Sequence, residues 1–262
     1  MRTVNDERTQ RVRCPVYGFI HYSANERKII EHWAFQRLRH IRQLAMTYLV
    51  YPGAMHSRFE HSVGVMELVT RAFEHLLRRH RNRIQTELKQ VPELADDTIE
   101  RAKQIVRLIA LLHDIGYPAF SHAAEGTIPG GDHEKLSVYV IQDVLGPEID
   151  RTFFRDASSL LGRLMEKNPE LSFLREFVTS RMDMDRTDYL RRDSIHCGVD
   201  YGVFDFHRLL ESLTVIQAPY SGRLRLAIEE GGEHTFEAPR QPASRSLPSA
   251  AQMPGWPSLR PD

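Results

Sequence analysis

The stretch of sequence that decides the fold is TIERAKQIVRLIALLHDIGYPAFSH, residues 98–122. Apolar side chains occur all round its first part, which is typical of a helix buried at the centre of a protein. Gly116, with a proline two residues later, predicts that this helix covers 98–116, with His113 and Asp114 in its last turn. An unpaired aspartate at the end of an apolar helix costs several kcal/mol, so Asp114 needs a positive partner.

Outward from this stretch, apolar residues recur at helical spacing along most of the chain. The further helices that this spacing predicts cover 26–50, 56–79, 133–145, 157–167 and 171–193. Only 213–217 and 223–229 have the composition of strands, and a turn containing Pro and Gly between them predicts one β-hairpin. The expected fold class is therefore all-α, a helical bundle with a small β-hairpin near its C-terminal end.

The chain is predicted to hold one structural domain, residues 1–232, since its length fits a single large domain. After Gly232 the composition changes, and prolines separated by Ser and Ala follow neither a helical nor a strand period. We expect residues 233–262 to be a disordered Pro/Ser-rich tail.

Composition excludes several classes of protein. Hydrophobic residues at 41% and charged residues at 27% are typical of a folded globular chain, which excludes wholesale disorder and fibrous folds. No apolar run approaches the roughly 20 residues of a membrane helix, and the charged N-terminus is unlike a signal peptide, so no membrane partner and a cytoplasmic location are expected. The equal counts of 35 basic and 35 acidic residues lack the basic excess of a nucleic-acid binder, which makes nucleic acid a less favoured partner.

The two cysteines, Cys14 and Cys197, stand far apart and form no CxxC pair. This spacing supports neither a disulfide framework nor a thiolate zinc site, so both are predicted to be packing residues.

Histidine and aspartate gather in four segments, HSRFEH (56–61), HDIGYPAFSH (113–122), DHEK (132–135) and DMDRTDYLRRD (183–193). A divalent cation would neutralise the buried aspartate, and its predicted ligands are His61, His113, Asp114 and Asp185. Two imidazoles and two carboxylates suit Fe, Mn or Zn and leave positions open for water or phosphate, and Mg is kept as a further identity. The alternative is a buried His–Asp hydrogen-bonded pair.

Basic residues beside these segments have the charge that a triphosphate requires, and the candidates are Arg58, Lys135, Arg186 and Arg192. His122 and His133 are candidates to protonate a leaving oxygen, because imidazole titrates near neutrality. Glu125 lies three residues after His122 and is placed to orient it. Each of these residues, taken alone, is more often an ordinary surface residue.

Together these segments, with QRLRHIRQL (36–44), resemble the HD-domain phosphohydrolases, and among them the SAMHD1-like and dGTPase-like deoxynucleoside triphosphate (dNTP) triphosphohydrolases. The resemblance covers about residues 12–230. It implies an HD-domain helical bundle, a homo-oligomer and metal-dependent hydrolysis of a dNTP to deoxynucleoside and triphosphate. The metal ligands that it implies are the same four residues.

The resemblance also assigns roles to other residues. Phosphate contact or catalysis is implied for Arg58, His122, Glu125, His133 and Arg186. Sugar contact is implied for Gln43, Leu44, Tyr189 and Asp193, while part of a regulatory nucleotide surface is implied for Glu31, Gln36 and Arg39. Two departures stand out: Tyr117 replaces a histidine of many SAMHD1-type relatives, and those relatives continue after the hairpin into further helices that contact the substrate.

Three functions stay open on the sequence alone. The first is the dNTP triphosphohydrolase. The second is another HD phosphohydrolase, acting on a nucleoside monophosphate, a signalling nucleotide or single-stranded nucleic acid. The third is a weakly catalytic module that binds nucleotides or a partner protein.

Overall fold

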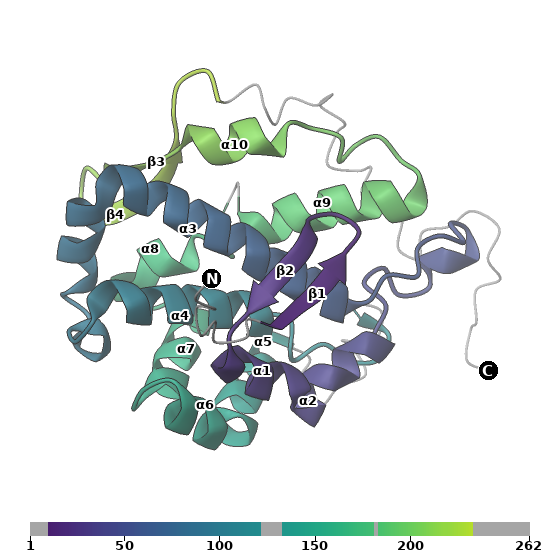
Figure 1. The fold of residues 1–262 in the computed structure, drawn as a ribbon, viewed down its shortest axis with the longest axis horizontal. Helices are drawn as coiled ribbons and strands as arrows, with labels where there is room; N and C mark the ends of the chain where they lie inside the picture. Colours follow the sequence, from purple (N-terminus) through teal and green to yellow (C-terminus); the bar gives the residue numbers. More distant parts are fainter. Residues whose placement is uncertain (1–9, 122–132, 181–182, 233–262) are drawn as a thin grey trace, which may run out of the picture.

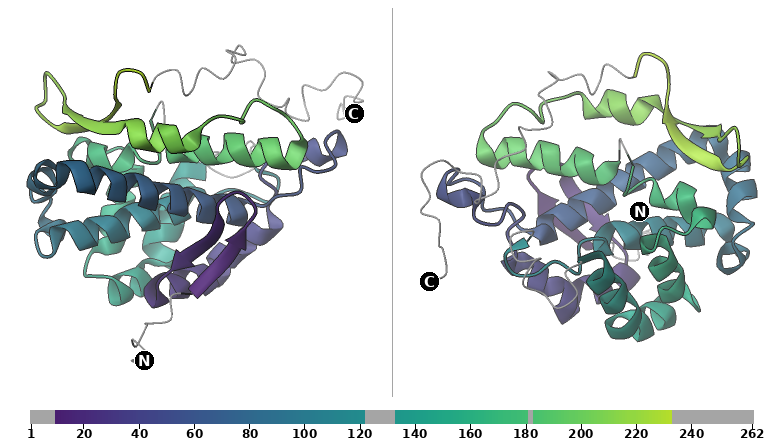
Figure 2. Two further views of the ribbon diagram at one scale, coloured as in Figure 1. Left: turned by 45° about the horizontal axis from the view of Figure 1, so that its top comes forward. Right: turned by 180° about the vertical axis from the view of Figure 1, so that it is seen from behind.

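A computed structural model describes residues 10–121, 133–180 and 183–232 (Figures 1 and 2). Its longer helices are α1 (Ala24–Glu31), α3 (Arg58–Leu88), α4 (Thr98–Leu112), α5 (His133–Tyr139), α6 (Gly146–Thr152), α7 (Ala157–Met165), α9 (Met184–Cys197) and α10 (Phe206–Ser212). Two single turns, α2 (Trp33–Gln36) and α8 (Ser172–Arg175), lie between them. The predicted helical bundle with a small hairpin near its C-terminal end is confirmed.

Helices α3 and α4 pack along each other and form the centre of the core. A capping box starts α3: the Ser57 hydroxyl accepts a hydrogen bond from the Glu60 amide, and the Glu60 carboxylate accepts one from the Ser57 amide. Both helices bury nearly continuous apolar faces, as the sequence predicts. Their packing brings the first turn of α3 next to the last residues of α4.

Helix α9 packs across α3 at Gly64. A β-carbon on Gly64 would lie 2.1 Å from Asp188 Oδ1 and 2.2 Å from Arg192 Nη2. The lack of a side chain on α3 therefore makes room for two charged side chains of α9.

Two antiparallel hairpins lie near different parts of α3 (Figures 1 and 2). The predicted hairpin is confirmed as β3 (Leu213–Gln217) and β4 (Leu224–Ile228), and Arg79, near the kink of α3, donates to the Leu213 carbonyl. The prediction of a single hairpin is wrong, because β1 (Gln10–Cys14) pairs with β2 (Gly18–Tyr22) beside the first half of α3. Gly18, at φ +81°, turns this short hairpin.

The single helix predicted over 26–50 is wrong. The chain leaves helical geometry at His32, with φ −65° and ψ 139°, and the His32 imidazole caps α2 by accepting a hydrogen bond from the Ala34 amide. After one 3₁₀ turn it leaves again at Ile41, and Ala45 adopts φ +48°. Apolar spacing continues across these breaks, so periodicity alone does not reveal them.

The helix predicted over 171–193 is also wrong, since helical structure stops after Arg175 and resumes with α9. Asp183 starts α9 by accepting hydrogen bonds from the Arg186 amide and the Ser180 amide, both at 2.7 Å. The helix predicted over 98–116 ends earlier, at Leu112, which leaves His113 and Asp114 just beyond its last turn. Helices α6 and α10 were not predicted.

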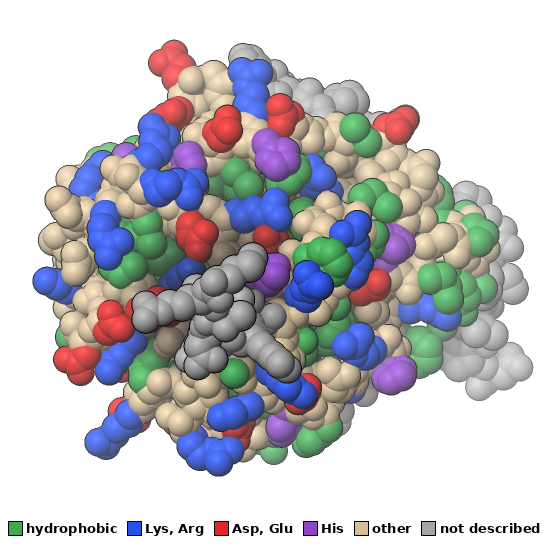
Figure 3. Space-filling model, viewed as in Figure 1, with side chains coloured by type: hydrophobic (Ala, Val, Ile, Leu, Met, Phe, Trp, Pro, Cys, Tyr) green, Lys and Arg blue, Asp and Glu red, His purple; other side chains and the backbone are tan. Residues whose placement is uncertain are grey.

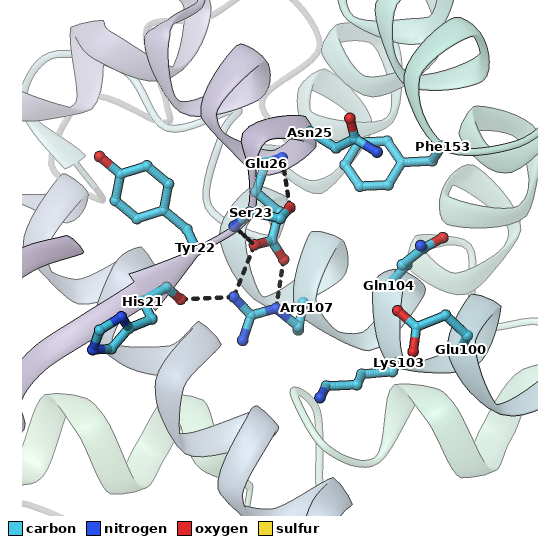
Figure 4. A pocket seen from close by; sticks show the side chains of 10 residues that line it. All are labelled: His21, Tyr22, Ser23, Asn25, Glu26, Glu100, Lys103, Gln104, Arg107 and Phe153. Carbon is cyan, nitrogen blue, oxygen red and sulfur yellow. Dashed lines mark hydrogen bonds and ion pairs between the residues drawn. The ribbon is translucent and has the colours of Figure 1, made fainter. Parts of the chain in front are cut away.

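Buried charges tie the N-terminal elements to the core. The carboxylate of Glu26 on α1 accepts two hydrogen bonds from Arg107 of α4, and Arg107 also donates to the His21 carbonyl at the end of β2 (Figure 4). These residues line a cavity of about 270 Å³. Because the Arg107 guanidinium is satisfied by these partners and by Thr70, its role in the structure is to hold β2 and α1 on α4.

Basic and acidic side chains alternate over the face that Figure 3 shows, in keeping with the balanced charge. No helix in the described part of the chain is long and apolar enough to cross a membrane. Cys14 and Cys197 are both free, and Cys14 is buried. The predicted tail, 233–262, lies outside the described residues.

Candidate metal centre

Three distant segments bring the four predicted metal ligands together. His61 comes from the first turn of α3, His113 and Asp114 follow α4, and Asp185 lies in the first turn of α9. Ligand atoms of His61, His113 and Asp114 all lie within 4.8 Å of one another. Asp185 Oδ1 is 3.0 Å from His61 Nε2 and 3.8 Å from His113 Nε2, so the fourth predicted ligand borders the same space.

The two imidazoles are oriented as metal ligands. His61 Nδ1 lies 2.8 Å from Asp188 Oδ2, and His113 Nδ1 lies 2.9 Å from the Ala110 carbonyl oxygen. Both Nε2 atoms are buried and make no well-aligned hydrogen bond among the described residues, although Asp185 Oδ1 lies 3.0 Å from that of His61. A proton on each Nδ1 leaves each Nε2 lone pair directed into the space that the carboxylates of Asp114 and Asp185 border. Histidine binds a divalent cation through such a lone pair. The residues present therefore fit such an ion.

The electrostatics of the cluster also call for a cation. Burial acts to lower the pKa of His61, but the neighbouring Asp185 and Asp188 carboxylates outweigh it and raise the pKa to about 10. Burial likewise opposes ionisation of Asp185, yet the His113 and His61 imidazoles hold its pKa well below its usual range. Asp185 is thus compensated by the protonated His61 and His113, a role that a divalent ion would take over.

Asp188 supports the centre from behind, and the sequence analysis missed it. Its buried carboxylate lies between His61 and Arg192. Oδ2 is 2.8 Å from His61 Nδ1, and the carboxylate accepts hydrogen bonds from Arg192 Nε and Nη2, each at 2.8 Å. The signal was present, since Asp188 stands three residues after Asp185 and four before Arg192. The prediction that Arg192 supplies charge to a phosphate is wrong, because its guanidinium is completely buried in this pair.

Arg58 borders the centre at Asp114. It is 2% exposed, donates to Asp114 Oδ2, and donates through Nε to Ser121 Oγ at 3.1 Å. Its guanidinium carbon lies 3.3 Å from the centre of the Tyr117 ring, and that ring stacks on His133 with centroids 4.0 Å apart. Tyr117, the departure noted in the sequence, therefore joins Arg58 to His133.

Residues with implied sugar contacts lie around this core. Asp193 is buried, and its carboxylate lies 2.9 Å from His56 Nε2 and 3.4 Å from the Tyr201 hydroxyl. Gln43 has a buried Oε1 without a hydrogen-bond partner in the described ranges, and its carbonyl lies 3.5 Å from Ser121 Oγ, which links it to Arg58. Leu44 and Tyr189 are half-buried.

The remaining candidates fall into two groups. Lys135 on α5 and Arg186 on α9 are exposed, and Arg186 directly follows the predicted ligand Asp185. His122 and Glu125 lie outside the described residues.

Comparison with known proteins agrees with this centre. The chain matches the HD domain family over residues 58–193, a range that contains all four predicted metal ligands. The chain therefore belongs to the HD domain family, whose members bind divalent metals.

Two curated relatives show the breadth of this family. The chain is 33% identical to an uncharacterized protein of Methanocaldococcus jannaschii, covering 87% of this chain and 42% of the relative. It is also 33% identical to the deoxynucleoside triphosphate triphosphohydrolase SAMHD1 of Gallus gallus, covering 78% of this chain and 36% of the relative. The chain thus spans less than half the length of the curated relatives that it matches.

Solved structures share the architecture. A phosphohydrolase from Bacteroides thetaiotaomicron is 30% identical, with a TM-score of 0.71, over 87% of this chain and 50% of that one. A hypothetical protein from Aquifex aeolicus is 33% identical, with a TM-score of 0.69, over 87% of this chain and 56% of that one.

Proposed function

We propose that the protein is a metal-dependent phosphohydrolase that cleaves deoxynucleoside triphosphates to deoxynucleoside and triphosphate. The observation that carries this proposal is the convergence of the buried Nε2 atoms of His61 and His113 on the carboxylates of Asp114 and Asp185. The SAMHD1 relatives support the choice of substrate.

His61, His113, Asp114 and Asp185 would hold the ion. When bound, a divalent cation supplies Lewis-acid polarisation of a phosphoryl oxygen and a water of lowered pKa. Asp188 fixes the tautomer of His61, and the Ala110 carbonyl fixes that of His113. The side chain of Asp185 is 33% exposed, so this edge of the centre is accessible to a substrate.

Arg58 is held rigidly, since Asp114, Ser121 and the Tyr117 ring fix its guanidinium on several sides. In the proposed reaction it stabilises negative charge that develops on the phosphate. The proton for the departing 5′-oxygen comes either from His133, which is stacked on Tyr117, or from His122, with Glu125 orienting it. Lys135 and Arg186 contact the phosphates, while Gln43, Leu44, Tyr189 and Asp193 contact the sugar.

The test begins with elemental analysis of the full chain purified with and without air. Each dNTP is then incubated with the protein and Mn²⁺, and the products are separated by chromatography. Triphosphate with deoxynucleoside supports the proposal, whereas pyrophosphate or a monophosphate product contradicts it. His133→Ala should retain the metal but lose about 100-fold or more in rate.

A second candidate is a phosphohydrolase with another substrate, such as a nucleoside monophosphate. It is favoured by the similar Bacteroides structure, which is named only as a phosphohydrolase. Bound metal, no turnover of any dNTP and release of phosphate from a nucleoside monophosphate would select it. Bound metal without turnover of any substrate would instead favour the third function, a weakly catalytic module that binds nucleotides.

A further inference from the structure

A large basic cavity lies beside α9, outside the four metal ligands. It measures about 790 Å³ and is bordered by the end of α7, by α8, by the first turn of α9 and by β4. This volume lies within the range of cavities that hold small ligands.

Charge dominates the lining of this cavity. Four cations, Lys167, Arg175, Arg186 and Arg225, face a single carboxylate, that of Glu176. Glu176 is 6% exposed and is already engaged, because it accepts hydrogen bonds from Arg225 and from the Leu226 amide. Even without Arg186, the cations Lys167, Arg175 and Arg225 outnumber the one carboxylate among the described lining residues.

Arg175 shows this excess most clearly. It is half-buried at the end of α8, and its guanidinium makes neither a hydrogen bond nor an ion pair with any residue in the described ranges. The Lys167 ammonium has only a partly exposed partner, Glu134, at 3.2 Å. A salt bridge between exposed side chains contributes little to stability, so Lys167 can exchange it for a ligand. Arg175 and Lys167 are therefore both available to bind a ligand.

The other lining groups restrict the class of ligand. Ser172 and Thr179 add hydroxyl donors, while none of the described lining residues has an aromatic ring or a large aliphatic side chain. These residues therefore offer a nucleobase no surface on which to stack. Arginine and lysine together with hydroxyl donors match phosphate oxygens instead.

We infer that this cavity binds an oligophosphate through Arg175, Lys167 and Arg225. Two sources share this chemistry: the phosphate chain of a substrate held at the neighbouring metal centre, or a free oligophosphate. Arg186 borders the cavity and directly follows Asp185, which places the two sites next to each other. The inference does not depend on dNTP hydrolysis, because it concerns binding.

The test is calorimetric titration of the full chain with sodium tripolyphosphate. Arg175→Ala should weaken binding about 10-fold, and Lys167→Ala combined with it should weaken binding further. Arg151→Ala is the matched control, since it removes an equal charge from an exposed residue of α6 and should change affinity less than twofold. Equal melting temperatures of the variants establish that they are folded.

Absence of tripolyphosphate binding by the wild-type protein, or equal losses in Arg175→Ala and Arg151→Ala, would overturn the inference. Asp114→Ala keeps this test separate from the proposed function, because it should abolish hydrolysis yet retain tripolyphosphate binding. Competition by tripolyphosphate against a dNTP identifies the phosphate chain of the substrate as the source. Simultaneous binding of both identifies a free oligophosphate.

Discussion

His61 lies between two carboxylates with different tasks. Its Nε2 faces Asp185 in the candidate metal centre, and its Nδ1 is held by the buried Asp188. His113 and Asp114 complete the centre from the end of α4. Removing one ligand should therefore affect metal binding directly, whereas removing Asp188 should affect it through the orientation of His61.

Replacing a ligand gives the first prediction. His113→Ala and Asp114→Ala should each lose the metal on purification and at least about 100-fold of the hydrolytic rate, because both remove an atom that faces the ion. Elemental analysis and product chromatography measure the two effects. Full activity in metal-free protein would refute the assignment of the centre.

Replacing the supporting carboxylate gives the second prediction. Asp188→Asn should weaken metal affinity about 10- to 100-fold, measured by competition with a chelator of known affinity. Asp150→Asn is a matched control, because Asp150 accepts hydrogen bonds from the Ser158 amide and hydroxyl far from the centre. Unchanged metal affinity in Asp188→Asn would show that Asp188 serves only to neutralise Arg192.

Cys197 provides a pH-dependent prediction. Burial, assisted by the negative charge of Asp193, raises the pKa of its thiol to about 11. Since only the thiolate reacts, alkylation of the native protein should keep accelerating about tenfold per pH unit from pH 8 to nearly 11. An ordinary thiol would level off near about 8.5. Peptide mass spectrometry after iodoacetamide treatment measures the rate, and urea-unfolded protein should show the ordinary profile.

At the scale of elements, the crossing of α3 and α9 depends on Gly64. Gly64→Ala should destabilise the fold by about 1–3 kcal/mol, because the added methyl group overlaps the Asp188 and Arg192 side chains. Gly146→Ala, at the start of α6, is the control: its β-carbon would lie 3.5 Å from the Ile141 carbonyl oxygen and from Ser158 Oγ, an ordinary contact, and stability should be unchanged or higher. Urea unfolding measures both, and equal stability of Gly64→Ala and wild type would contradict the close crossing.

The elements also show how far sequence reasoning reaches. Helices α3, α4, α5 and α7 follow from apolar spacing, and the segments that carry His61, His113 and Asp185 could be found from composition and order. The breaks at His32 and before Asp183 could not, because they are set by side-chain caps while the apolar period continues. Hairpin β1–β2 was not predicted, because its short strands bury few side chains and so show no clear apolar alternation. Arg192 was recognised only as a charge and Asp188 was not singled out, because only tertiary packing makes them a buried pair.

For the molecule as a whole, a bound cation should stabilise the folded state, because the ligands meet only there. At a metal concentration 100 times the dissociation constant the gain is about 2.7 kcal/mol. Chelation should therefore lower the melting temperature of the wild type in differential scanning calorimetry. Asp114→Ala should show no such response, and an equal shift in both proteins would assign the stabilisation to a site elsewhere.

The wide separation of the ligands in the chain bears on how the protein is made. His61 and its supporting carboxylate Asp188 are 127 positions apart. Loop closure over such a span must occur before the histidine is oriented, and long-range contacts of this kind form slowly. A nascent chain that has emerged only as far as α7 lacks the last helix of the centre, so tight metal uptake would have to wait until α9 has been made. Tight binding of the ion would then indicate that α3 and α9 have already packed together.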